Sequence, residues 1–154
     1  MNDADLLALN GFQEANLEPD DGLAAVCRVV LNRARQHYQS HGDIQSTIFW
    51  PNAFSWTEFS VVGGKYERVA FTPEEVQARA ADLLARAKMY ATAWARAVRI
   101  AGEVQAGAYH GPLYDELTDD VVLYLNPLIV PHLPAWATPD KEVCRIGHHA
   151  FFAA

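Results

Sequence analysis

A glutamate, Glu14, is the residue of this chain whose type and position best suit acid–base chemistry. It follows an apolar, helix-prone segment and precedes a break at Pro19. A carboxylic acid at the end of a partly buried helix loses hydration, which disfavours its charged form and raises its pKa. Such a group can hold a proton near neutral pH and donate it to a leaving oxygen, as glycosidic bond cleavage requires. The alternative is a solvated glutamate at a helix end, which is the commoner situation for this residue type.

Other side chains could assist Glu14. Glu18 follows it by four residues, so on a helix the two carboxylates would share a face, although Pro19 disfavours helical geometry at Glu18. Aromatic residues fall in predicted loops and strand ends, where most should pack in a core and one or two could line a groove and stack on sugar rings. These residues are Trp50, Phe54, Trp56, Tyr109, Tyr114, Tyr124 and Trp136.

Six histidines are present, and the neighbours His148 and His149 would point to opposite faces of a strand. No HExxH or His-x-His pattern occurs, so we predict no metal site. The sequence also lacks the glycine-rich patterns of phosphate-binding loops and the GxSxG pattern of a serine nucleophile. The histidines leave a metal-dependent amidase or peptidase open as a weaker alternative.

Helices must position Glu14. Residues 3–16 are predicted to be a helix with Asp3 as its N-cap. A second helix begins near Asp20 or Asp21, because apolar residues then recur at positions i, i+3, i+4, i+7 and i+8. These apolar residues are Leu23, Val26, Cys27, Val30 and Leu31. Cys27 on this stripe is expected to be a small core residue.

The rest of the chain is predicted from local signals. His37–Gly42 should be a loop, Ile44–Phe49 a short helical turn, and residues 61–66 a surface loop or small hairpin. Thr72 to Glu75 has the form of a capping box, which opens a long helix-prone region. A single helix there would be too long for this domain, so we expect a break near Asp82 and a main helix at 83–105.

A strand at Val121–Leu125, a proline-rich loop and a closing strand at residues 145–152 should complete the chain. The predicted fold is therefore α+β and mainly helical, with a small β-sheet or hairpin in the C-terminal half. Residues 1–154 should form a single catalytic domain.

Charge and composition restrict the possible partners. The net charge of −7 is opposite to the basic patch that nucleic-acid binding needs, and it disfavours anionic membranes. No run of residues is apolar enough to cross a bilayer, and the N-terminus lacks the features of a secretory signal. Two distant cysteines give no disulfide framework. We expect a monomer without cofactor, nucleic-acid partner or stable membrane insertion.

The order of the segments resembles the SleB-type cell-wall hydrolase family, which includes spore-cortex lytic enzymes and phage lysins. The family's Gly-Glu-Ala-Arg-Gly-Glu segment corresponds to residues 13–18, and its Ala-Val-Ala-x-Val-Val-Leu-Asn-Arg segment to residues 25–33. Its Phe-Ser-Trp, Tyr-x-Asn-Pro-like and Ile-Gly-x-His elements correspond to residues 54–56, 124–127 and 146–149. The first motif departs from the family at Asn16 and Leu17, which leaves the acid in place and alters the contacts expected in the groove.

The resemblance implies a lysozyme-like core with one essential glutamate and lytic transglycosylase chemistry on peptidoglycan glycan strands. Glu14 takes the catalytic acid/base position, and the MurNAc–GlcNAc bond would be cleaved with formation of 1,6-anhydro products. The substrate-binding residues implied by the matched motifs are Glu18, Phe54, Ser55, Trp56, Tyr124, Asn126 and His148. A hydrolytic muramidase and a non-catalytic wall-binding module remain alternatives. Without a signal segment, we expect an enzyme made in the cytoplasm that acts on the cell wall, phage-encoded and released through a holin-type lesion or carried in a virion.

Overall fold

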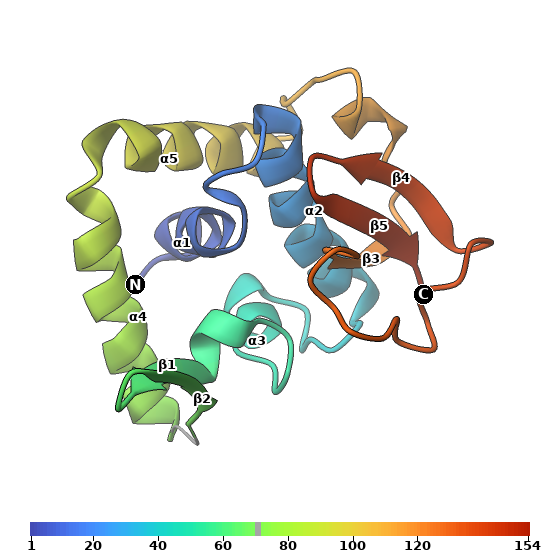
Figure 1. The fold of residues 1–154 in the computed structure, drawn as a ribbon. Coiled ribbons are helices and arrows are strands. Elements are labelled where there is room, and N and C mark those ends of the chain that lie inside the picture. The colour runs from blue at the N-terminus through green and yellow to red at the C-terminus, as the bar shows by residue number, and fades with distance from the viewer. Residues whose placement is uncertain (70–71) are drawn as a thin grey trace.

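Two consecutive helices, α1 (Asp3–Ala15) and α2 (Asp20–Gln36), form the centre of the core in the computed structural model, which describes residues 1–69 and 72–154 (Figure 1). They approach closely at Gly11, where an added Cβ would lie 3.0 Å from the Cys27 Sγ atom. Cys27 is fully buried, as predicted, and burial raises the pKa of its thiol to about 12. The N-cap of α1 is Asn2, whose side chain accepts a hydrogen bond from the Asp5 N–H, so the prediction of Asp3 is wrong by one residue.

The next segment contains the predicted loop at 37–42 and then short elements. These are helix α3 (Ile44–Ile48), the 3-10 helix η1 (Ser55–Thr57) and an antiparallel hairpin of β1 (Phe59–Val62) and β2 (Lys65–Arg68). The hairpin turns through two glycines with positive φ, Gly63 and Gly64. Of the two predicted possibilities for residues 61–66, the structure therefore has the hairpin.

Helices α4 (Pro73–Lys88) and α5 (Ala91–Gln105) meet at a corner and enclose α1 on two sides (Figure 1). The predicted capping box is present, with Thr72 and Glu75 bonding each other's backbone. The predicted break near Asp82 is wrong, because the chain leaves helical geometry at Tyr90. The rings of Tyr90 and Trp94 contact Phe12 of α1, so packing against α1 fixes the corner at that point.

The C-terminal half begins with the 3-10 helix η2 (Tyr114–Glu116) and forms an antiparallel sheet in the order β3-β5-β4. Strand β3 (Val121–Leu125) matches the prediction and packs against α2. The predicted single closing strand is instead a hairpin of β4 (Glu142–Ile146) and β5 (His149–Ala153). Gly147 makes this turn possible, because its φ of 58° is a conformation that favours glycine.

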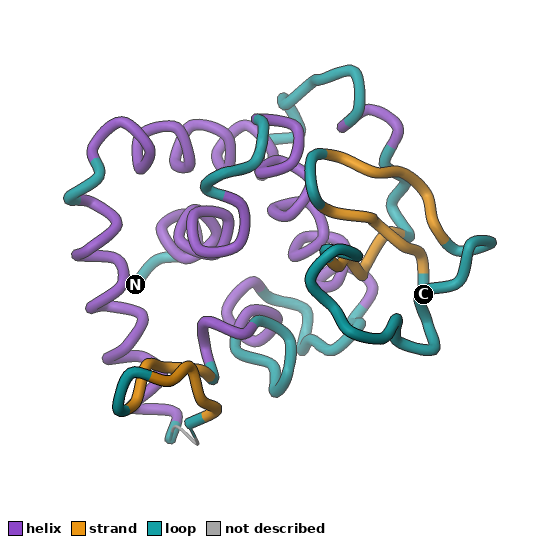
Figure 2. The backbone as a smooth tube through the Cα atoms, in the orientation of Figure 1, coloured by secondary structure: helices purple, strands orange, loops and turns teal. Residues whose placement is uncertain are grey.

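The mainly helical α+β architecture with a small C-terminal sheet is thus confirmed. Figure 2 shows the helices in the centre and on one side, and the three-stranded sheet on the other. Within residues 1–69 and 72–154, no helix has the length and apolar character needed to cross a bilayer.

Candidate active site

Glu14 lies in the last turn of α1, where the helix meets the sheet. Its Oε2 atom accepts a hydrogen bond of 2.6 Å from the Tyr124 hydroxyl of β3. Burial raises the pKa of the Glu14 carboxyl, and the Tyr124 hydroxyl and the Arg33 charge oppose that rise. Burial therefore favours the protonated form of Glu14, while Tyr124 and Arg33 stabilise its ionised form.

Tyr124 is held in place by other rings of the sheet. Its ring centroid lies 5.0 Å from that of His149 and 5.6 Å from that of Phe151. Burial, with the Glu14 charge next in size, raises the pKa of Tyr124 well above its ordinary value. The hydroxyl therefore stays protonated and donates to Glu14. Burial also lowers the pKa of His149, so this neighbouring imidazole favours its neutral form.

Arg33 places a buried positive charge beside the acid. It is 5% exposed, its Nε donates to the Val122 carbonyl at 2.6 Å, and its guanidinium lies 5.3 Å from the Phe54 ring centroid. Among the described residues, its Nη1 atom has no hydrogen-bond partner. The spacing of Arg33, three residues after Val30 and seven after Val26, puts it on the buried stripe of α2.

Glu18 is separated from Glu14 by the end of α1, so the two carboxylates do not form a pair on one helix face. Glu18 is 9% exposed, and its side chain binds the turn before β5. Oε2 accepts from the His148 N–H at 3.1 Å, and Oε1 lies 3.0 Å from the His148 Nδ1. Glu18 therefore ties the loop after the acid to the sheet, with Gly147 packed directly against its carboxylate.

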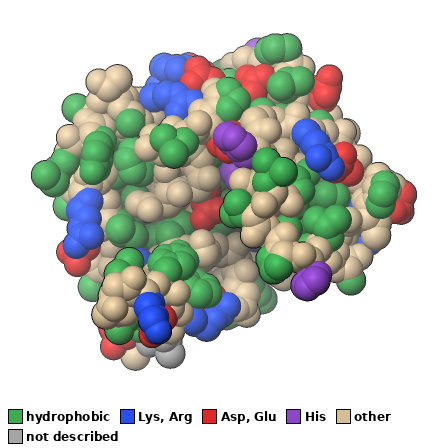
Figure 3. All heavy atoms as spheres, viewed as in Figure 1, with side chains coloured by type: hydrophobic (Ala, Val, Ile, Leu, Met, Phe, Trp, Pro, Cys, Tyr) green, Lys and Arg blue, Asp and Glu red, His purple; other side chains and the backbone are tan. Residues whose placement is uncertain are grey.

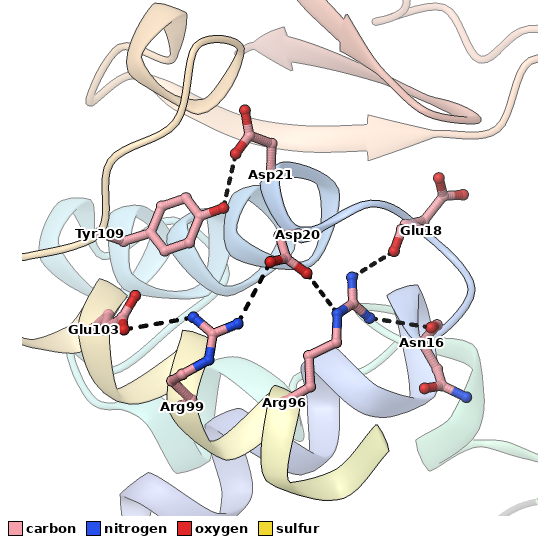
Figure 4. Close-up of polar contacts among 8 residues, drawn as sticks. All are labelled: Asn16, Glu18, Asp20, Asp21, Arg96, Arg99, Glu103 and Tyr109. Carbon is pink, nitrogen blue, oxygen red and sulfur yellow. Dashed lines mark hydrogen bonds and ion pairs between the residues drawn. The ribbon is translucent and has the colours of Figure 1, made fainter. Parts of the chain in front are cut away.

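Helix α5 holds the same loop from the other side (Figure 4). Arg96 donates to the Glu18 carbonyl at 2.6 Å and to the Asn16 carbonyl at 3.3 Å, and pairs with Asp20 at 2.6 Å. Arg99 reaches the other Asp20 oxygen at 3.4 Å. The hydrogen bond from Arg96 lowers the pKa of Asp20 below its ordinary value. Burial opposes this shift, and the charge of Arg99 adds to it. The backbone that follows Glu14 is therefore fixed by side chains from about 80 residues later, which no local pattern indicates.

The remaining predicted substrate-binding residues differ in accessibility. Phe54 and Trp56 are 3% and 5% exposed, so neither offers an open ring face, and the structure gives no support to direct stacking on substrate. The Trp56 Nε1 donates to the Asn10 Oδ1 at 2.8 Å, which fixes η1 below α1. Ser55 is exposed. Asn126 is partly buried, and its Oδ1 accepts from the Leu128 N–H.

Figure 3 shows acidic atoms in a shallow hollow near the centre of the face in view, with histidine atoms beside it. A separate concavity of about 710 Å³ lies between α3 and the start of α4, lined by residues such as Phe49, Pro51 and Val76. It does not include Glu14 and has no acid with a raised pKa. Within the described residues, no group of three His, Cys, Asp or Glu side chains is arranged to hold a metal ion.

Comparisons with known proteins agree with this description. Residues 17–152 match the model of the Cell Wall Hydrolase family. That match begins just after Glu14, so it does not itself cover the acid. No curated protein sequence matches the chain. Among solved structures, the fold is similar to the catalytic domain of the germination-specific lytic transglycosylase SleB from Bacillus anthracis. The TM-score is 0.60 with 21% identity, over 99% of this chain and 94% of that one.

Proposed function

The chain belongs to the Cell Wall Hydrolase family, and we propose that within this family it cleaves the MurNAc–GlcNAc glycosidic bond of peptidoglycan as a lytic transglycosylase. Glu14 is the acid and the base of the reaction in this proposal. The observation that carries it is the environment of this carboxyl: it is partly buried at the end of α1, its pKa is raised, and it accepts a hydrogen bond of 2.6 Å from the Tyr124 hydroxyl. A general acid needs such a retained proton at working pH.

The reaction needs only one carboxyl group. Glu14 gives its proton to the glycosidic oxygen as the bond from that oxygen to the anomeric carbon of MurNAc breaks. The 6-hydroxyl of the same MurNAc then bonds to the anomeric carbon and gives its proton back to Glu14. The product is a 1,6-anhydro ring, and the carboxyl returns to its starting state. Between the two steps the Tyr124 hydroxyl and the buried charge of Arg33 stabilise the carboxylate.

The alternative is a hydrolytic muramidase, which would cleave the same MurNAc–GlcNAc bond with water. Two-carboxylate hydrolysis needs a second acid across the scissile bond, for water or for direct attack. Glu18 is the carboxylate nearest to Glu14 in the chain, and its two oxygens are occupied by His148. This arrangement supports the transglycosylase over the muramidase.

Product analysis on purified sacculi tests the proposal. Mass spectrometry should find anhydromuropeptides, whereas reducing-end muramic acid would identify a hydrolysing muramidase. Glu14→Gln keeps the shape and the acceptor for Tyr124 but removes the proton, so turnover should fall by roughly 10²–10⁴-fold. Near-normal turnover in this variant would remove Glu14 from the mechanism.

Two alternatives from other classes have separate readouts. A metal-dependent amidase would lose activity in strong chelator, and the described residues give it no clustered ligand set. A non-catalytic wall-binding module would sediment with peptidoglycan and release no soluble fragments. We expect soluble fragments and full activity in chelator.

A further inference from the structure

The β1–β2 hairpin carries an exposed aromatic face that no step of the reaction uses. Phe59 pairs with Arg68 and Val61 with Tyr66, so these four side chains share one face of the hairpin. Tyr66 is 60% exposed and Val61 69%. Exposed apolar side chains gathered on one small element are characteristic of binding surfaces.

The aromatic side chains on this face are ordered. The rings of Phe59 and Tyr66 are stacked, with centroids 5.1 Å apart and an interplanar angle of 19°. The Arg68 guanidinium lies 5.0 Å from the Phe59 ring centroid. Phe59 is partly buried, so it supports Tyr66 as the accessible ring of the stack. A ring held in this way loses little conformational entropy on binding.

Polar groups with fixed positions lie beside the stack. The Arg68 Nη1 donates to the Asn52 Oδ1 at 2.6 Å and to the Glu58 Oε2 at 2.7 Å. The Asn52 N–H donates to the Glu58 Oε1 at 2.6 Å. An aromatic face next to amide, carboxylate and guanidinium groups suits a sugar, whose ring has apolar faces and a polar edge of hydroxyl and N-acetyl groups.

A chain of contacts joins this face to the acid. Asn10 and Glu14 are four residues apart on α1 and share a face, and Asn10 holds Trp56. Arg79 donates to the carbonyls of Trp56 and Phe59, at 2.9 and 2.6 Å, so the root of the hairpin is fixed to η1. The C-terminal end of α1 and the hairpin both lie toward the viewer in Figure 1, and Figure 3 shows the hollow above the hairpin on that face.

We propose that the β1–β2 hairpin is a second glycan-binding surface, on which Tyr66 stacks against a sugar of the peptidoglycan strand away from the bond cleaved at Glu14. The inference rests on the proposed function for the identity of the polymer. A strand is the expected occupant because the substrate is a polymer that extends beyond the cleaved bond.

Binding and cleavage are measured separately to test this surface. In a Glu14→Gln background, co-sedimentation with purified sacculi gives the affinity without turnover. Tyr66→Ala should weaken that affinity by roughly 2- to 12-fold, since an aromatic contact contributes about 0.5–1.5 kcal/mol. Tyr66→Phe keeps the ring and should bind like the parent. Val62→Ala is the matched control, because Val62 is 49% exposed on the opposite face of the hairpin.

In the active chain, Tyr66→Ala should raise KM on long glycan strands and leave kcat nearly unchanged. Its cleavage of the shortest oligosaccharides that are still substrates should match the parent. Equal affinity of Tyr66→Ala and Val62→Ala for sacculi, with normal melting temperatures, would overturn the hairpin proposal. Retained cleavage by Glu14→Gln would overturn the catalytic proposal instead, while the affinity measurements would still decide the role of Tyr66.

Discussion

Substitution of Tyr124 by Phe is the most direct test of how the protein sets the proton affinity of Glu14. The variant keeps the ring, and therefore its packing against His149 and Phe151, and removes only the hydroxyl that donates to Glu14. A hydrogen bond to a charged group contributes about 1.5–3 kcal/mol and one to a neutral group about 0.5–1.5 kcal/mol. The Tyr124 hydroxyl therefore favours the ionised over the protonated form of Glu14 by roughly 1 kcal/mol.

The direction of the change follows from this difference. Activity requires protonated Glu14, so it falls as pH rises through the pKa of this group. Removing the hydroxyl raises that pKa further, and the alkaline limb of the kcat/KM profile should move to higher pH. The rate at the optimum should fall as well, because a weaker acid gives up its proton less readily.

The assay is clearance of purified sacculi across a pH series. Tyr109→Phe is the matched control, because it removes a hydroxyl that donates to a different carboxylate, Asp21, at 2.7 Å. Its alkaline limb should coincide with that of the parent. A Tyr124→Phe limb that stays in place, or moves to lower pH, would refute the assignment of Glu14 as the acid whose proton Tyr124 controls.

Three further predictions concern stability and loop position. Burial raises the pKa of Glu14, so folding favours the protonated carboxyl. The stability that this group contributes is fully present below its ordinary pKa of 4.5 and is lost as pH rises through the raised pKa. Glu14→Gln should therefore melt at a higher temperature than the parent at pH 8 and at the same temperature at pH 4. Gly147→Ala should lower the free energy of unfolding by about 1–3 kcal/mol in urea titration, because φ is 58° and the new Cβ meets the Glu18 carboxylate; an unchanged midpoint would contradict this turn geometry. Arg96→Lys should lower kcat by roughly 10-fold or more through displacement of the loop after Glu14, whereas Arg99→Lys, in an exposed ion pair, should leave kcat near the parent value.

Local patterns in the sequence were sufficient to predict the helices and strands that begin or end at distinctive residues. The stripe around Cys27 predicted α2, and the capping box at Thr72 predicted the start of α4. The corner between α4 and α5 was misplaced because residues 73–105 favour helix almost uniformly. Its position depends on packing of Tyr90 against Phe12, two residues that are distant in the chain.

The position of Glu14 near the end of a helix was predictable from the sequence. Residue type alone did not show that Phe54 and Trp56 are buried, since aromatic rings serve both cores and grooves. The partners of the acid come from far along the chain: Tyr124 is 110 residues after Glu14. Such pairs are set by the packing of α1 and α2 against β3, which periodicity does not describe.

The opposed influences on Glu14 bear on how many carboxyl groups the reaction uses. Burial favours the protonated form of Glu14, which makes the group a weaker acid and its carboxylate more costly. Tyr124 and Arg33 reduce that cost, so the protonated and ionised forms come closer in free energy. A residue that donates a proton to one oxygen and takes one from another must be able to reach both forms in each turnover. The balance at position 14 therefore suits a single group that acts twice, and Glu18, which is bound to His148, is not needed as a second acid.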